Sequence, residues 1–141
     1  MTSQEFLTPV LVLILWTLIM WLWMYITRIP AMTAAKMDPN DARHPGTYAD
    51  KIPSNVRAVA DNYNHLHEQP TVFYALMLFS AATGGGTYTM LYLGFGYVGL
   101  RVLHSLIQVL SPNVMLRFLV FSSSTLVLMA MAIIEALRVF L

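Results

Sequence analysis

The chain has 141 residues, of which 57% are hydrophobic and 11% are charged. This composition excludes an ordinary soluble domain, in which about a quarter of the residues are charged, and indicates an integral membrane protein. Because the chain has no cysteine and a formal net charge of +1, disulfides, thiolate metal sites and cysteine nucleophiles are excluded, and nothing in the charge favours nucleic-acid binding.

The first predicted element is a helix over residues 6–27, which contain no charged side chain. Its 22 residues give about 33 Å of helix, enough to cross a hydrocarbon core of about 30 Å. Trp21, Trp23 and Tyr25 form an aromatic cluster typical of a membrane interface. A cleaved signal peptide is the weaker interpretation, because the apolar run is long and no basic residue precedes it.

A polar loop is predicted over about residues 28–54, because prolines and a glycine interrupt any long helix there. These breaking residues are Pro30, Pro39, Pro45, Gly46 and Pro53. With its edges the loop holds Arg28, Lys36, Arg43, Lys51 and Arg57. The positive-inside rule therefore places it in the cytoplasm, and both termini on the opposite side. Two interpretations stay open, a connection folded over a site and a mobile linker.

A second helix is predicted over about residues 55–82, with a polar stripe along one side. Arg57, Asp61, His65 or Asn64, and Glu68 follow one another at helical spacing and so share a face. Charges facing lipid cost about 2.5–3.5 kcal/mol each on insertion scales, so the stripe predicts a polar site inside the protein or against a neighbouring subunit. The alternative is a solvated face below the membrane. Pro70 predicts a bend at or just before the end of the stripe.

Third and fourth helices are predicted over about residues 87–110 and 114–139, the former after a Gly84–Gly86 turn. Arg101, His104, Ser105 and Gln108 make a second polar stripe near the cytoplasmic end. We interpret Gly94, Gly96 and Gly99 as packing residues.

The fourth helix carries Arg117 near its cytoplasmic end, and Glu135 and Arg138 are spaced to pair with each other. The run from Ser122 to Thr125 is expected to hydrogen-bond to its own helix.

The two stripes and Arg117 are expected to converge at one depth in the cytoplasmic half. Arginine, glutamate, amide and imidazole groups together suit a small zwitterionic ligand, and an arginine beside a thiol favours the reactive thiolate. The alternative is internal pairing, Arg57 with Asp61 and Glu68 with Arg101, that only stabilises the assembly. The histidines lack the spacing of a metal site, so no metal is expected.

Two segments carry a family resemblance. R-A-x3-N-x-N-H-L-x-E-x-P-x3-Y over residues 57–74 and R-x2-H-S-x-I over residues 101–107 resemble the MAPEG family, membrane-associated proteins of eicosanoid and glutathione metabolism. The resemblance implies one all-α membrane domain over residues 1–141, an antiparallel four-helix bundle assembled as a homotrimer, in a divergent bacterial member of the inner membrane. It also implies glutathione bound between subunits, with Glu68 holding its amino group, Arg101 and His104 lining the site and Arg117 activating its thiol.

The sequence departs from the family pattern at several of these positions. Asp61 and His65 stand where glutathione-using members commonly have arginine and asparagine, and Arg57 or Asn64 would substitute. His104 and Gln108 replace two tyrosines of the leukotriene-forming branch, and Arg117 comes about two residues later than the arginine it matches.

Two functions are therefore weighed: a glutathione transferase or peroxidase acting on lipophilic electrophiles, and a non-catalytic protein binding a lipid or a partner protein. The expected catalytic residue is Arg117. The expected cofactor-binding residues are Arg57, Asp61, Asn64, His65, Glu68, Arg101, His104 and Gln108.

Overall fold

The computed structural model describes residues 1–44 and 50–141, and every regular element in these ranges is helical. The helices are α1 (Ser3–Phe6), α2 (Thr8–Ala34), the 3-10 helix η1 (Pro39–Ala42), α3 (Ser54–His65), α4 (Gln69–Ala82), α5 (Tyr88–Leu110) and α6 (Val114–Phe140). Three of them, α2, α5 and α6, are long and apolar enough to cross a membrane. The expected all-α membrane protein is thus confirmed at this level. Pro45 and Gly46, expected to prevent a long helix in the loop, lie outside the described residues.

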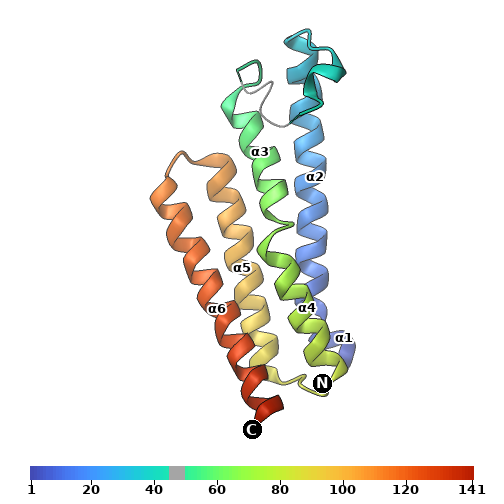
Figure 1. The fold of residues 1–141 in the computed structure, drawn as a ribbon, viewed down its shortest axis with the longest axis vertical. Coiled ribbons are helices and arrows are strands. Elements are labelled where there is room, and N and C mark those ends of the chain that lie inside the picture. The colour runs from blue at the N-terminus through green and yellow to red at the C-terminus, as the bar shows by residue number, and fades with distance from the viewer. Residues whose placement is uncertain (45–49) are drawn as a thin grey trace.

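The helices run alongside one another, as Figure 1 shows. α3 and α4 follow end to end and form one column next to α2, while α5 and α6 lie side by side. α5 is the central element, because it packs against α2, α3 and α6. Both termini lie at one end, and the segment between α2 and α3 lies at the other (Figure 1). Consecutive long elements are therefore antiparallel, and the turns from α4 to α5 and from α5 to α6 are short.

The first long helix extends beyond its expected end at Thr27. α2 continues to Ala34 and contains Pro30, so the expectation that Pro30 lies in the loop is wrong. A proline removes one backbone donor, which kinks a membrane helix without having to end it. The helix ends instead where Lys36 takes a left-handed conformation (φ 50°). The backbone N–H groups of Lys36 and Met37 then donate to the carbonyls of Thr33 and Met32, a Schellman ending.

The expected helix over residues 55–82 is interrupted. α3 ends at His65 and α4 begins at Gln69, and the backbone of Glu68 is far from helical (φ −92°, ψ −100°). Pro70 lies in the first turn of α4, where its missing N–H has no partner to lose. The bend expected before Pro70 is therefore a complete break, and the helical phase of α3 does not carry over into α4.

A tight polar cluster closes the turn between α4 and α5. Arg138 pairs with Glu135 (Nη2 to Oε2, 2.7 Å), as the spacing predicts, and donates from Nη1 to the Thr83 carbonyl at 3.1 Å. The hydroxyl of Ser80 donates to the other oxygen of Glu135 at 2.7 Å. A Cβ on Gly85 would come within 2.5 Å of that oxygen. The turn thus needs glycine at this position so that a buried carboxylate can approach the backbone.

Side-chain caps fix the starts of α1, α5 and α6. Thr87 and Asn113 accept hydrogen bonds from Met90 N and Leu116 N at the starts of α5 and α6, as strongly preferred N-cap residues do. At α1, Thr2 and Glu5 form a capping box. The pKa of Glu5 is lowered because its carboxylate accepts a hydrogen bond from the Thr2 backbone N–H.

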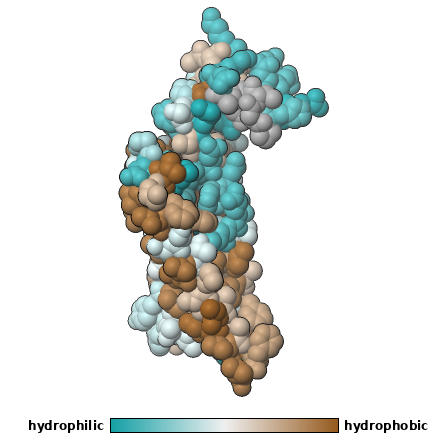
Figure 2. Space-filling view, turned by 60° about the vertical axis from the view of Figure 1, so that its left-hand side comes forward, coloured by the Kyte–Doolittle hydropathy of each residue, from teal (hydrophilic) through white to brown (hydrophobic). Residues whose placement is uncertain are grey.

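The surface divides along the long axis. In Figure 2, hydrophilic residues cover the end that carries the α2–α3 connection and continue part of the way down the molecule, where hydrophobic residues take over. Exposed apolar side chains run along α2 and α6, among them Leu18, Leu22, Leu126 and Ile133. Since water-facing helices rarely expose so many large apolar groups, these faces fit a lipid environment.

Candidate functional site

Arg101 of α5 reaches across to the broken end of α3. Its Nη2 donates to the backbone carbonyl of His65 at 3.0 Å and lies 3.0 Å from Nδ1 of the same residue. The backbone donor to the His65 carbonyl is the distant N–H of Glu68, at 3.4 Å, and a cation is favourable at a helix C-terminus. Arg101 is fully buried. Its first role is therefore to hold the end of α3 in place.

The same contact determines the tautomer of His65. A guanidinium only donates, so Nδ1 of His65 must accept, and in the neutral ring the proton is on Nε2. Nε2 lies 4.0 Å from Oε2 of Glu68. Arg101, His65 and Glu68 thus form one line of polar groups that leads from the interior at Arg101 to the surface at Glu68.

Aromatic rings complete the cluster around His65. The ring centroids of His65 and His104 lie 4.9 Å apart, and Phe121 of α6 lies 5.2 Å from His65, edge to face. The guanidinium carbon of Arg101 stands 5.6 Å from the centroid of the Phe121 ring, within cation–π range. Phe121 therefore joins α6 to the polar groups of α3 and α5.

Beside this cluster is a pocket of about 190 Å³, which we call the histidine pocket. Its lining residues are His65, His104, Val114, Arg117, Phe118 and Phe121. Two imidazoles and one guanidinium thus face a space whose other walls are apolar. Such a wall composition suits the thiol or carboxylate of a small ligand next to a lipophilic group.

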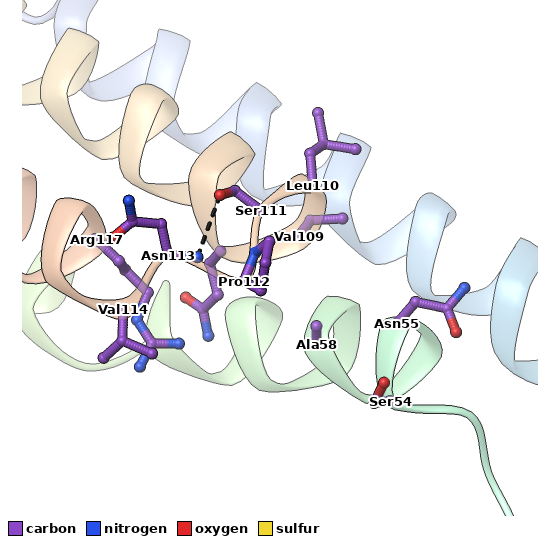
Figure 3. A pocket seen from close by; sticks show the side chains of 11 residues that line it. Ser54, Asn55, Ala58, Val109, Leu110, Ser111, Pro112, Asn113, Val114 and Arg117 are labelled. Carbon is purple, nitrogen blue, oxygen red and sulfur yellow. Dashed lines mark hydrogen bonds between the residues drawn. The ribbon is translucent and has the colours of Figure 1, made fainter.

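A larger pocket of about 420 Å³, the turn pocket, lies where α3 begins and α5 passes into α6. Figure 3 shows Ser54, Asn55 and Ala58 of α3 on one side and the residues around the α5–α6 turn on the other, with the Asn113 backbone N–H donating to the Ser111 hydroxyl at 3.2 Å. Arg117 and Val114 line both pockets. The two spaces are therefore neighbours with a shared wall.

The predicted site residues divide into three groups. His65, Glu68, Arg101, His104 and Arg117 come together around the histidine pocket or through the His65 contacts. Gln108 lines the turn pocket instead.

The remaining residues are Arg57, Asp61 and Asn64 of α3. They line neither pocket, and Asp61 and Asn64 are exposed. Neither expected pair, Arg57 with Asp61 or Glu68 with Arg101, is among the ion pairs of residues 1–44 and 50–141. The side chain of Glu68 is 68% exposed.

One positioning residue has no strong signal in the sequence. Gln69, the first residue of α4, donates from Nε2 to the Thr125 hydroxyl at 2.8 Å and accepts a hydrogen bond from the Tyr97 hydroxyl at 3.3 Å. These bonds tie the start of α4 to both α5 and α6. The one hint in the sequence is that the amide of Gln69 comes directly before Pro70, where a bend was expected.

Comparison with known proteins gives one match. The model of the MAPEG family matches residues 6–137 of the chain. Searches of curated proteins and of solved structures found no match.

Proposed function

The chain belongs to the MAPEG family, and from this membership and the geometry above we propose that it is a membrane enzyme that uses glutathione against lipophilic electrophiles. The observation that carries the proposal is the convergence of Arg117, His65 and His104 on the histidine pocket. Electrophiles dissolved in the bilayer would reach this pocket along its apolar walls, as a glutathione transferase or peroxidase of lipophilic substrates requires.

The residues present fit glutathione by charge and by number of polar groups. The tripeptide carries two carboxylates, an ammonium and a thiol. Arg117, on the wall common to both pockets, would pair with the thiolate or a carboxylate, and the exposed carboxylate of Glu68 would hold the ammonium. Asn55, Gln108 and Asn113 in the turn pocket would hydrogen-bond to the peptide groups.

Bound glutathione would supply the nucleophilic sulfur for conjugation or peroxide reduction. A guanidinium beside a thiol stabilises the thiolate, which is the reactive form. His65 and His104 have imidazole nitrogens able to donate or accept a proton next to the reacting atoms. Phe118 and Phe121 exclude water on the lipid side and so strengthen the electrostatic effect of Arg117.

We extend the proposal to the assembly. The α3–α4 column would cross the membrane as the fourth helix of a bundle, with the α2–α3 connection in the cytoplasm and both termini outside, in a bacterial inner membrane. Asp61, Asn64 and Glu68 are exposed in the single chain, and lipid contact would make this costly. A homotrimer that covers them against neighbouring subunits, with water access from the cytoplasm, removes that cost.

The test is turnover of a chloronitrobenzene substrate with glutathione by the detergent-solubilised protein. Arg117→Ala should lower kcat/KM by about 100-fold or more, the typical effect of losing one preorganised charge donor. The matched control is Arg43→Ala, which removes an exposed arginine and should leave turnover unchanged. Absence of turnover together with no glutathione binding at millimolar concentration would refute the proposal.

A second candidate function rests on Asp61 and Arg101. Asp61 gives an exposed carboxylate where glutathione-using relatives are expected to have arginine, and Arg101 is enclosed within the chain. Both favour a non-catalytic protein that binds a lipid or a partner protein through its exposed faces. Co-purification of a stoichiometric lipid or protein, with full function retained in Arg117→Ala, would support this candidate over the enzyme.

A further inference from the structure

Three polar side chains between α3 and α5 are fully enclosed and have atoms without hydrogen-bond partners. Asn62, Arg101 and Ser105 each have 0% of their surface exposed. Among the described residues no partner reaches Nδ2 or Oδ1 of Asn62, Nε or Nη1 of Arg101, or Oγ of Ser105. Buried polar atoms are nearly always hydrogen-bonded, so three such residues together call for a missing partner.

The fold brings these three residues to one place. Arg101 contacts His65, and α3 and α5 pack together and run in opposite directions. Asn62 lies one turn before His65 on α3, and Ser105 lies one turn after Arg101 on α5. Both steps lead toward the same end of the molecule, so Asn62 and Ser105 stand at the same level, one turn from the guanidinium of Arg101.

Charge identifies the kind of partner. No aspartate or glutamate of the described residues lies within 4.0 Å of the Arg101 guanidinium, and its known contacts are His65 and the ring of Phe121. An unpaired buried charge is among the least favourable features a fold can retain. Water would satisfy the hydrogen bonds of Arg101 and leave its charge uncompensated.

We propose that a single small inorganic anion of the size of chloride binds between α3 and α5. Nε of Arg101, Nδ2 of Asn62 and the hydroxyl of Ser105 donate hydrogen bonds to it, and waters satisfy Nη1 of Arg101 and Oδ1 of Asn62. The ligand is small because all three residues are completely enclosed. Neither the histidine pocket nor the turn pocket includes any of them, so this site is separate from the proposed glutathione site and does not depend on it.

The anion has a structural consequence at the end of α3. By neutralising Arg101, it allows the guanidinium to stay buried against the carbonyl of His65. The break between α3 and α4, and with it the placement of Glu68 at the surface, would then be stabilised by the bound anion. Stability of the folded protein should rise with anion concentration in a saturable manner, as for any ligand that binds only the native state.

The experiment measures thermal unfolding of the full-length protein in mild detergent while chloride replaces gluconate at constant ionic strength. Chloride and bromide should raise the midpoint with saturation, whereas gluconate, which is too large to enter, should not. Ser105→Ala should raise the chloride concentration at half-effect by about 10- to 100-fold, the worth of one hydrogen bond to a charged group.

A substitution can also supply the missing charge. Asn62→Asp places a carboxylate beside Arg101 and should make stability independent of chloride. Asn64→Asp is the matched control, because Asn64 is exposed on the same helix, and it should keep the dependence of the native protein.

Equal midpoints in chloride and gluconate for the native protein would overturn the proposal, and so would a chloride effect that Ser105→Ala leaves unchanged. Crystals soaked in bromide give an independent test that does not rely on any variant. An anomalous peak between α3 and α5 would support the site, and water alone at that position would refute it. If Asn62→Asp fails to fold, the chloride series with Ser105→Ala and the bromide crystals still decide the question.

Discussion

Replacing Gly85 by alanine should destabilise the protein at the end that carries both termini. The new Cβ would lie 2.5 Å from Oε1 of Glu135, 2.7 Å from the hydroxyl of Ser80 and 2.8 Å from Nε of Arg138. All three distances are shorter than any contact a real Cβ makes, so the buried carboxylate must move. Overpacking of this kind costs about 1–3 kcal/mol, and the cost rises toward about 3–5 kcal/mol if the move separates Glu135 from Arg138.

The assay is reversible unfolding in mixed micelles, followed by circular dichroism, for Gly85→Ala and Gly96→Ala in parallel. Gly96 is the matched control, because a Cβ there meets no atom within 4 Å and alanine within a helix is favoured over glycine by about 0.5–1 kcal/mol. The two variants should therefore shift stability in opposite directions. Equal stability of Gly85→Ala and the native protein would refute the close approach of Glu135 to the turn.

Substitutions at three further positions test single contacts, each by the same unfolding assay unless stated. Gln69→Leu should cost about 1–3 kcal/mol, because it leaves the Tyr97 hydroxyl without its acceptor and removes the donor to the Thr125 hydroxyl. Gln69→Glu should cost less at low pH than at neutral pH, because only the protonated carboxyl keeps both a donor and an acceptor. Thr87→Ala should cost about 1 kcal/mol through loss of the N-cap of α5, and Thr87→Ser should restore it. Phe121→Leu should weaken glutathione binding measured by calorimetry, because the ring that holds the imidazoles is lost; unchanged affinity would contradict that role.

The sequence was sufficient where a single residue type or spacing determines the structure. The charge-free run after Phe6 predicted a membrane helix, and α2, α5 and α6 are long and apolar enough to span a membrane. The spacing of Glu135 and Arg138 predicted their pairing, because residues three apart on a helix face each other. The expected starts of the third and fourth helices, at about residues 87 and 114, lie within one residue of the starts of α5 and α6 at Tyr88 and Val114.

The polar stripe could not be predicted in full, because the prediction assumed one uninterrupted helix from Arg57 to Glu68. Once the helix breaks after His65, Glu68 no longer lies at a fixed angle from Arg57 and Asp61, and its side chain is mostly exposed. The burial of Asn62 depends on the packing of α3 against α2 and α5, which no local spacing shows. Similarly, nothing in the sequence indicated that Arg101 would turn inward to the His65 carbonyl.

The most direct test of the proposed function is the ultraviolet absorbance of the glutathione thiolate on titration into the purified protein. We expect a saturable increase in thiolate absorbance at neutral pH in the native protein and in Arg43→Ala, and a loss of this signal in Arg117→Ala, because the guanidinium on the wall of the histidine pocket stabilises the ionised sulfur. Glutathione that binds without ionising, or a thiolate signal that is unchanged in Arg117→Ala, would contradict the assignment of Arg117.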